Sequence, residues 1–505
     1  MLDVIAAAPE GLLQALSGVG VLYLLCGTIL GFIIGILPGI GGPTALALLI
    51  PFSYGLTPHH GMLLMAGAMG SVTFGGAITA ILVNVPGSPV NIATCFDGYP
   101  LAQKGKAGYA ISTSAVASSL GGIFGIVVLI LAMPVLRMLL LRFGPPEYFL
   151  AIMFGLISIP LFTQGSLIKG LFAGFLGIVL GFIGFDLTTG TLRYTFGSLY
   201  LYDGIQLVPM LLGVFAVAEA IQLATTRRSV TPVVTKQNYG DIIAGAKAVF
   251  KYKVTFLRSS ALATVIGIIP GMGGVIANTF AWITTAQLSP RREYFGKGEI
   301  EGIVASEAAN NAKDGGSLLP TLAFGIPGSA TMAVLLGAFI MYGIAPGPAL
   351  LSSQLGLTWT IIWGLLFATI VSSLLGALLA PYLAKITMIS GSLVAPVIII
   401  VSLIGALATR LSIYDVFVTL IFGVVGYLMT RHGWPKITLV LGFILGSLAE
   451  YSFIQSLAIS DNGLMIFLQR PISVIIITAL ILSIVFTQVY IPIKAKRKRM
   501  RDVSS

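Results

Sequence analysis

A run of polar residues interrupts one of the apolar stretches of the chain, between Ala305 and Gly316. Four of these residues fall at i, i+3, i+4 and i+7, so on a helix they share one face. Carboxylate and amide oxygens are hard ligands that suit Na⁺, and a carboxylate in apolar surroundings can also carry a proton. The residues of this candidate cation-coupling face are Glu307, Asn310, Asn311 and Asp314. We expect the two asparagines to coordinate a cation, and Glu307 to titrate if that cation is a proton.

A structural interpretation of the same residues stays open. Lys313 lies within the polar run, and in this interpretation it pairs with Glu307 or with Asp314 in an ion-pair or capping cluster at a membrane edge. The stretch 66–73, which aligns with the polar run in the first half of the chain, holds no carboxylate. The sequence therefore predicts two halves that share a backbone frame but differ in their ligands.

Four proline-glycine segments interrupt the apolar pattern, and they form two matching pairs. We call them break 1 (Pro38–Gly42), break 2 (Pro86–Ser88), break 3 (Pro270–Gly274) and break 4 (Pro327–Ser329). Break 3 repeats break 1 at an offset of 232 residues (270 − 38), and break 4 repeats break 2 at an offset of 241 (327 − 86). The chain is thus an internal duplication, with nine extra residues (241 − 232) that we place near 290–298.

The breaks are candidate binding segments because glycine and proline deprive a helix of stiffness and of hydrogen bonds. A helix that stops inside a membrane leaves unpaired N–H groups, which suit a carboxylate, and unpaired C=O groups, which suit a cation. Irregular backbone is not tolerated against lipid, so we expect the two breaks of each half to converge in a sheltered, water-lined site. The alternative, for any single glycine, is close helix packing through small residues.

The candidate substrate-binding residues are those of the four breaks, together with one asparagine that precedes break 2. They are Pro38, Gly39, Gly41, Gly42, Asn84, Pro86, Gly87, Ser88, Pro270, Gly271, Gly273, Gly274, Pro327, Gly328 and Ser329. Three further polar residues near the breaks, Asn91, Asn278 and Thr331, could equally well satisfy loop backbone. Three scattered histidines and two cysteines predict no resident metal centre and no cofactor, so the only ion that we expect is a co-transported Na⁺ or H⁺.

Composition identifies lipid as the solvent of these segments. The 505 residues are 57% hydrophobic and 9% charged, against about 25% charged residues in a soluble domain, and the mean hydropathy is +1.01. About 11 to 13 segments are apolar over the roughly 17 to 25 residues that a membrane helix needs. The prediction is an all-α polytopic membrane protein built from two inverted-topology repeats with broken helices or re-entrant hairpins.

The duplication and the charge distribution together predict the domain organisation. The expected parts are a first transmembrane repeat (15–222), a basic cytoplasmic linker (223–258), a second transmembrane repeat (259–460), an extra C-terminal transmembrane helix (472–490) and a basic cytoplasmic tail (491–505).

Basic residues set the expected orientation. Seven Lys or Arg and one acid lie between Thr225 and Arg258, six more basic residues follow Ile493, and the first 17 residues contain none. By the positive-inside rule the central loop and the C-terminus are cytoplasmic and the N-terminus lies outside, which requires an odd number of crossings in the first repeat and inverts the second. The alternative for the basic tail is attraction to anionic lipid. We expect the lipid bilayer, and no nucleic acid, as a partner.

Motifs of other reaction classes are absent from the sequence. It contains no G-x-x-x-x-G-K-[ST] loop for ATP, no H-E-x-x-H metal motif and no recognisable nucleophile motif, so we do not expect an enzyme. Paired central breaks favour a secondary transporter that works by alternating access. A channel for ions or solutes, or a structural membrane subunit without transport activity of its own, remains the alternative.

Four strings resemble a known family. They are Ile36–Pro43, Asn84–Pro89, Glu307–Ala312 and Phe324–Ser329, which in this order resemble the large membrane subunit, TctA, of bacterial tripartite tricarboxylate transporters. The resemblance extends over roughly 15–490. It implies a cation-coupled importer of an organic carboxylate, a tricarboxylate or dicarboxylate such as citrate, in the bacterial cytoplasmic (inner) membrane. It also implies two protein partners, a small membrane subunit and a periplasmic solute-binding protein that delivers the carboxylate.

Overall fold

The chain folds almost entirely as helices, as expected for the all-α class. The computed structural model describes residues 2–162, 166–186, 190–225, 239–386 and 391–490. Within these ranges nine helices are long and apolar enough to cross a membrane, and five shorter apolar helices accompany them. The only strands of the described residues are β1 (Gly184–Phe185) and β2 (Leu192–Arg193), which pair antiparallel. The fold class is therefore confirmed, and the inverted orientation of the repeats stays a prediction.

The helices divide into two compact units. Unit 1 comprises Met1–Arg137 and Gln206–Leu428, and unit 2 comprises Met138–Ile205 and Met429–Ser505. Two helices, α7 and α19, continue from one unit into the other along the chain. The units do not follow the two predicted repeats, because unit 1 contains the larger part of both repeats. The predicted boundaries of the repeats stay a prediction.

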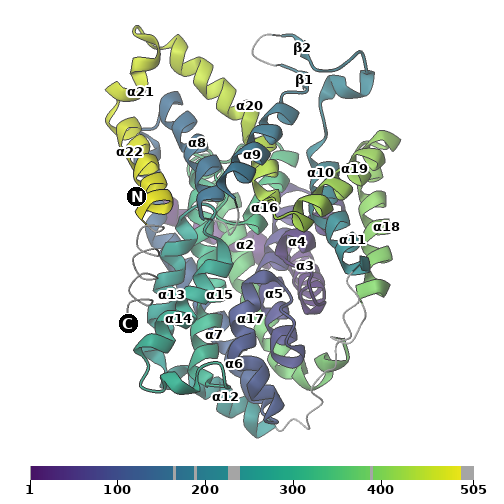
Figure 1. The fold of residues 1–505 in the computed structure, drawn as a ribbon, viewed down its shortest axis with the longest axis vertical. Coiled ribbons are helices and arrows are strands. Elements are labelled where there is room, and N and C mark those ends of the chain that lie inside the picture. Colours follow the sequence, from purple (N-terminus) through teal and green to yellow (C-terminus); the bar gives the residue numbers. More distant parts are fainter. Residues whose placement is uncertain (1, 163–165, 187–189, 226–238, 387–390, 491–505) are drawn as a thin grey trace, which may run out of the picture. The chain divides into compact units, whose positions relative to one another are not determined.

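Unit 1 contains all four breaks (Figure 1). Its elements are α1 (Leu2–Ala6), α2 (Ala8–Leu16), α3 (Gly18–Ile36), α4 (Gly42–Ser53), α5 (Pro58–Val83), η1 (Pro89–Asn91), α6 (Ile92–Gln103), α7 (Ala107–Leu140), α10 (Leu207–Leu211), η3 (Leu212–Val217), α11 (Ala218–Thr225), α12 (Tyr239–Lys251), α13 (Lys253–Ile268), α14 (Gly273–Leu288), η4 (Arg292–Tyr294), α15 (Ile300–Phe324), α16 (Ala330–Met341), α17 (Leu355–Ile386), α18 (Gly391–Arg410) and α19 (Ile413–Arg431).

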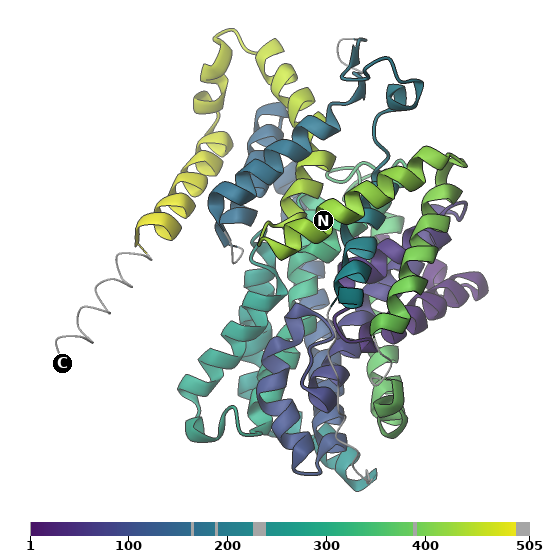
Figure 2. The same ribbon diagram turned by 45° about the vertical axis from the view of Figure 1, so that its right-hand side comes forward.

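Unit 2 is built around α20, which packs against α8 and α9 (Figure 2). Its elements are α8 (Pro145–Phe162), α9 (Leu167–Gly181), β1, β2, η2 (Leu199–Asp203), α20 (Lys436–Ala458), η5 (Gly463–Met465), α21 (Ile466–Gln469), α22 (Pro471–Val485) and η6 (Phe486–Tyr490). The buried carboxylate of Glu147 accepts hydrogen bonds from Arg470 Nε (2.6 Å) and Ser473 Oγ (2.7 Å). These bonds attach α22 to the start of α8.

The duplication is visible in the positions at which helices end. Helices α3 and α13 stop at Ile36 and Ile268, which are 232 residues apart. Helices α5 and α15 both end on a left-handed residue, Asn84 (φ 55°) and Gly325 (φ 67°), which are 241 residues apart. A residue in the left-handed conformation turns the backbone out of the helix, so the regular hydrogen bonds between residues four apart end there. The internal repeat that the sequence predicts is therefore a repeat of helix boundaries.

The extra residues of the second half lie where we expected an insertion. In the first half only 54–57 separate α4 from α5, whereas 289–299, which include η4, separate α14 from α15. Helix α14 is also longer than α4, at 16 residues against 12. The insertion therefore lengthens the connection and leaves the helix ends at the breaks in register.

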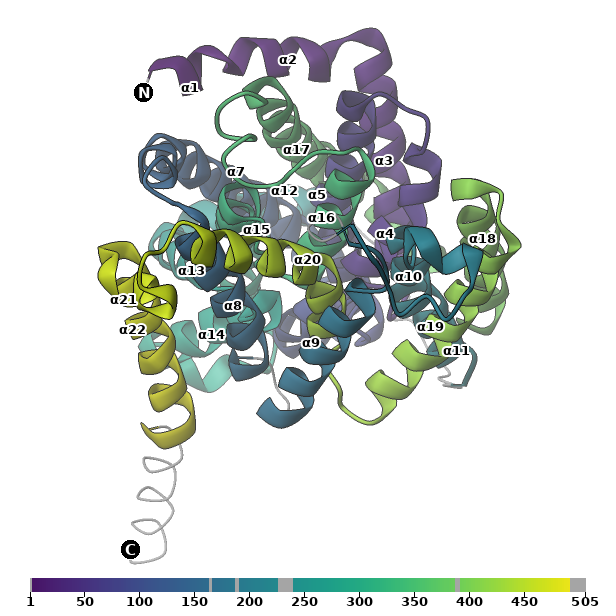
Figure 3. The same cartoon turned by 90° about the horizontal axis from the view of Figure 1, so that it is seen from above.

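Small residues allow the helices of unit 1 to pack closely. Gly27, Gly31 and Gly35 face α5, and a Cβ atom at any of them would collide with the α5 backbone or the side chain of Ser71. Figure 3 shows α3 beside α5, and α1 and α2 along one edge of the unit. This glycine stripe is the packing that brings two membrane helices into backbone contact.

Part of the predicted basic linker is helical. The described portion of 223–258 contains the end of α11, all of α12 and the start of α13. The length of apolar runs did not identify α12, because this helix has only 13 residues and is not strongly apolar. Several residues behind the predicted orientation lie outside the described ranges, namely Arg227, Arg228, Lys236, Lys494, Lys496, Arg497, Lys498, Arg499 and Arg501.

Candidate functional site

Breaks 1 and 2 lie together, as the sequence predicts for the first half. The Gly87 N–H donates to the Gly76 carbonyl of α5 (3.2 Å). A Cβ atom at Gly87 would lie 2.6 Å from the carbonyl oxygen of Gly35, at the end of α3. A Cβ atom at Gly41 would lie 3.2 Å from the Cβ of Ser88. Break 2 is thus inserted between the end of α3 and the C-terminal half of α5.

Breaks 3 and 4 reproduce this arrangement in the second half. A Cβ atom at Gly328 would lie 2.8 Å from the carbonyl oxygen of Gly267, at the end of α13, and 2.8 Å from Ser317 on α15. Gly267 corresponds to Gly35, and Ser317 corresponds to Gly76, by the two sequence offsets. The two breaks of each half therefore lie together, as expected, through equivalent residues. That they line a water-filled site stays a prediction.

Contacts between the halves are reciprocal. A Cβ atom at Gly42, the first residue of α4, would lie 2.6 Å from Thr331 Oγ1, at the start of α16. A Cβ atom at Gly274, at the start of α14, would lie 2.6 Å from Val90 Cγ1 in η1. Gly274 corresponds to Gly42 and Thr331 to Val90, so each half offers the same surface to the other, as in an isologous interface. All four breaks therefore meet in one region of unit 1.

Most of the predicted binding residues lie in this region, although they differ in exposure. The buried residues are Gly42, Gly87, Ser88, Pro270, Gly271, Gly274, Pro327 and Gly328. The half-buried residues are Pro38, Gly39, Gly41, Pro86, Gly273 and Ser329. The Ser329 hydroxyl accepts a hydrogen bond from the Met332 N–H (3.3 Å) and so caps α16.

Asn84 is the exception among the predicted binding residues, because it is exposed at the end of α5. It borders an open cavity of about 480 Å³. The other lining residues of the cavity are Cys95, Phe96, Tyr99, Pro100, Trp282 and Gly296. Asn84 therefore belongs to an aromatic groove beside break 2.

The polar face of α15 connects directly to the breaks. The Glu307 carboxylate accepts a hydrogen bond from the Thr94 hydroxyl of α6 and a longer one from Asn310 Nδ2 (3.5 Å). The Asn278 amide of α14 donates to Asn310 Oδ1 (2.9 Å) and to the Val90 carbonyl (2.7 Å). A chain of polar contacts thus runs from the middle of α15 to the residue that touches break 3.

Asn311 differs from its neighbours on this face. Its side chain is 4% exposed, and neither its amide nitrogen nor its oxygen has a hydrogen-bond partner among the described residues. A Cβ atom at Gly122 on α7 would lie 3.4 Å from Asn311 Cβ and 2.8 Å from Thr369 Cγ2 on α17. A buried amide without partners is uncommon in a folded protein and calls for an explanation such as an ion or a water molecule.

Asp314 pairs with its neighbour. Lys313 Nζ lies 2.7 Å from Asp314 Oδ1, and both side chains are more than nine-tenths buried. Of the two ion pairs that the sequence left open, this is the one that forms. Glu307, by contrast, is held by a hydroxyl and an amide.

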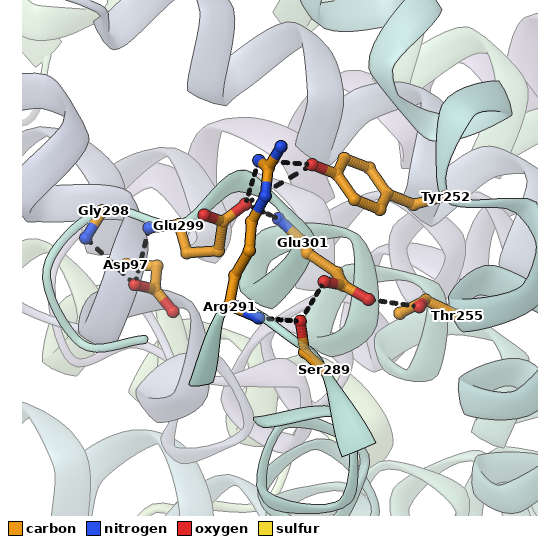
Figure 4. A network of polar contacts seen from close by, with 8 residues as sticks. All are labelled: Asp97, Tyr252, Thr255, Ser289, Arg291, Gly298, Glu299 and Glu301. Carbon is orange, nitrogen blue, oxygen red and sulfur yellow. Dashed lines mark hydrogen bonds and ion pairs between the residues drawn. The ribbon is translucent and has the colours of Figure 1, made fainter. Parts of the chain in front are cut away.

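Sequence reasoning missed a second polar network, which lies at the start of α15 (Figure 4). The Asp97 carboxylate of α6 accepts hydrogen bonds from the N–H groups of Gly296 (2.8 Å), Gly298 (3.0 Å) and Glu299 (2.9 Å), and from Trp282 Nε1 (2.8 Å). Burial raises the pKa of Asp97, while these donors act to lower it. Asp97 thereby fixes the inserted loop against α6.

The same network joins three helices through Glu301. Its carboxylate accepts hydrogen bonds from Thr255 Oγ1 (2.6 Å) of α13 and from Ser289 Oγ (2.7 Å) at the end of α14. Arg291 Nη1 lies 3.6 Å from Glu299 Oε1. Satisfied acids of this kind position the helices, and no signal in the sequence distinguished them from ligands. The described part of the chain holds no group of three His, Cys, Asp or Glu side chains that could bind a metal ion.

Comparison with known proteins supports a transport role. Residues 21–441 match the model of the tripartite tricarboxylate transporter TctA family. A protein of Agrobacterium vitis, described as an uncharacterised 52.8 kDa protein in the TAR-I ttuC' 3' region, is 34% identical over 483 residues, which are 94% of each chain. A second Agrobacterium vitis protein, from the TAR-II ttuC' 3' region, is 34% identical over 210 residues, 42% of this chain and 87% of its own.

No solved structure matches the chain. The sequence match nevertheless covers both breaks of each half and the polar face of α15, which are the elements that build the site. Such transporters normally combine this membrane component with a small membrane subunit and a binding protein. The chain belongs to the tripartite tricarboxylate transporter TctA family and is a multi-pass membrane protein.

Proposed function

We propose that this chain is the subunit that carries an organic carboxylate, a tricarboxylate or dicarboxylate, through the bacterial cytoplasmic membrane by cation-coupled alternating access. A periplasmic solute-binding protein delivers the substrate, and a small membrane subunit completes the transporter. The observation that carries this proposal is the reciprocal meeting of the four breaks. Two structurally equivalent halves that share one central contact region are the arrangement on which alternating access is built.

The chemistry of the breaks suits an anion. Helices α4 and α14 begin within a break, and α16 begins directly after one, so their first N–H groups have no partner within the helix and carry the positive end of the helix dipole. In α16 the Ser329 hydroxyl already accepts from one of them, the Met332 N–H. A carboxylate that enters between the halves meets these donors without requiring a dedicated arginine. Close approach is possible because glycines form the surface there.

The polar face of α15 suits the coupled cation. Asn311 supplies an amide oxygen that has no partner among the described residues, and Glu307 supplies a buried carboxylate close to it along the helix. An ionisable residue buried inside a membrane protein costs free energy, and such residues commonly serve in ion or proton pathways. We assign Na⁺ or H⁺ coupling to this face.

Transport measurements test the proposal. Right-side-out membrane vesicles that contain the chain and its small membrane subunit, with the binding protein added outside, should take up labelled citrate or succinate, with saturation and with a dependence on an imposed Na⁺ or pH gradient. Vesicles that lack the binding protein are the matched control and should take up little. Steady single-channel current from the purified chain, or uptake that rises linearly with substrate, would favour the channel alternative and contradict the proposal.

The proposed orientation places the N-terminus in the periplasm and the central basic segment in the cytoplasm. In a chain whose Cys26 and Cys95 are replaced by serine, a membrane-impermeant maleimide should label Ala6→Cys in intact spheroplasts. It should label Lys247→Cys, on the exposed side of α12, only after permeabilisation. Labelling of Lys247→Cys in sealed cells would refute this orientation.

A further inference from the structure

A buried ion pair occupies the middle of α15. Lys313 and Asp314 are 5% and 5% exposed, and their charged atoms are 2.7 Å apart. Removing two charges from water costs several kcal/mol for each ion, and replacing such a pair by apolar residues is often neutral or stabilising. The pair therefore needs a reason other than stability.

The first half of the chain shows what the fold needs at this position. By the offset of 241, Lys313 corresponds to Val72 and Asp314 to Thr73. A Cβ atom at Gly35 would collide with the Val72 carbonyl, and a Cβ atom at Gly267 would collide with the Lys313 carbonyl, so the two positions have the same backbone contacts. An uncharged Val-Thr pair satisfies these contacts in the first half. The charges are specific to the second half.

The Lys313 side chain extends to the region where the halves meet. A Cβ atom at Gly274 would collide with Lys313 Cε and would also lie 2.6 Å from Val90 Cγ1. The lysine stem thus passes over the first turn of α14, a helix of 16 residues, beside break 2 of the other half. An ammonium group in this place adds a full positive charge to the N–H groups that begin α14.

We propose that Lys313 binds a carboxylate of the transported anion, and that Asp314 is the internal carboxylate that holds the lysine while the site is empty. This inference rests on the proposed transport function and names the residue that recognises the substrate. Lysine suits the role because its ammonium is a compact charge on a flexible stem, which can turn from one carboxylate to another.

This exchange links substrate binding to cation binding. While Lys313 and Asp314 are paired, as they are in the structure, their charges cancel. When a substrate carboxylate takes the ammonium, Asp314 is left buried without a counter-charge, which is strongly unfavourable. A cation that binds Asp314 restores neutrality, so each carboxylate bound by Lys313 favours the entry of one positive charge. The face on which Asp314 lies is the one to which cation coupling is assigned.

The decisive variant copies the first half of the chain. The double change Lys313→Val with Asp314→Thr installs the residues that the equivalent position already accommodates, so the chain should fold and insert normally. In vesicles with the partner subunits, we expect this variant to raise the KM for citrate and succinate by at least about 30-fold, the range expected for loss of one partner of a buried charge pair. Lys313→Arg should retain part of the affinity. Lys106→Gln, at an exposed lysine, should leave uptake unchanged.

The outcomes separate this inference from the proposed function. Saturable uptake by the wild-type chain together with an unchanged KM in a normally expressed double variant would overturn the role of Lys313 alone. A wild-type chain that takes up neither citrate nor succinate in the presence of its partners would overturn the proposed function and this inference with it. If Lys313→Val alone loses expression while the double variant does not, Asp314 is confirmed as a buried charge that depends on Lys313.

Discussion

The variant Gly87→Ala is expected to accumulate as little or no folded protein. The added Cβ atom would collide with the backbone of Gly76 on α5 and would lie 2.6 Å from the carbonyl oxygen of Gly35 on α3. Both obstacles are backbone atoms of helices in close contact, so neither can rotate aside as a side chain would. Overpacking of a core costs about 1–3 kcal/mol even where side chains can adjust, and rigid backbone raises that cost.

The measurement is the yield and the thermal stability of detergent-solubilised chain, by fluorescence-detected size-exclusion chromatography. Gly328→Ala, the equivalent change in break 4, should have a comparable effect, because its Cβ atom would lie 2.8 Å from both Gly267 and Ser317. Gly18→Ala is the matched control, since a Cβ atom there has no described neighbour within 4 Å. A Gly87→Ala chain with wild-type yield and melting temperature would show that break 2 does not pack in this way.

The second large effect is expected from the cation face of α15. Asn311→Ala should be expressed at the wild-type level, because Asn311 has no hydrogen-bond partner among the described residues to lose. If its amide oxygen binds the coupled cation, the Na⁺ concentration for half-maximal uptake should rise by about tenfold or more, the loss of one charge–dipole ligand. Asn462→Ala, at an exposed asparagine of unit 2, is the control and should leave the Na⁺ dependence unchanged.

Glu307→Gln distinguishes the two cations. Glutamine keeps the volume of Glu307 and can still accept from Thr94, so the variant should fold. With H⁺ as the coupled ion, transport by this variant should lose its dependence on the pH gradient, whereas with Na⁺ bound at Asn311 it should retain a weaker Na⁺ dependence. Loss of expression for Glu307→Gln, combined with normal transport by Asn311→Ala, would support a purely structural role for this face.

The sequence predicted the architecture through its repeats. Proline and glycine mark where a helix must end, and the two offsets placed those ends in both halves, including the extra residues between α14 and α15. Convergence within each half followed from a general requirement, because irregular backbone needs shelter from lipid. These predictions depend on local composition and on one physical rule, which is why they could be made without coordinates.

Partners across the fold could not be predicted in the same way. Helical spacing places Glu307, Asn310 and Asn311 on one side of α15, but it carries no information on which helices face that side. In the structure Glu307 contacts α6, Asn310 contacts α14, and Asn311 lies toward α7. Of these three side chains, that of Asn311 alone has no hydrogen-bond partner among the described residues. For the same reason the sequence could not decide whether Lys313 pairs with Glu307 or with Asp314, since both acids lie within reach along the helix.

Buried structural acids form a further group that the sequence could not identify. Asp97 is a lone acid in an ordinary helix, and its function of fixing an inserted loop depends on backbone N–H groups about 200 residues away, at Gly296 and Gly298. Backbone donors leave no trace in the amino-acid sequence. A prediction from residue types alone therefore ranks such an acid no differently from an exposed one.

The reciprocal contacts between the halves have a consequence for biogenesis. Gly42 meets Thr331 and Val90 meets Gly274, so residues that leave the ribosome early have contacts with residues made much later. Contacts of such high sequence separation form slowly and leave surfaces open in the meantime. The first half thus enters the membrane with one side of breaks 1 and 2 uncovered, and it depends on the insertion machinery until α14 and α16 arrive. Synthesis of the second half through α16, rather than insertion of any helix of the first half, is the step that covers breaks 1 and 2.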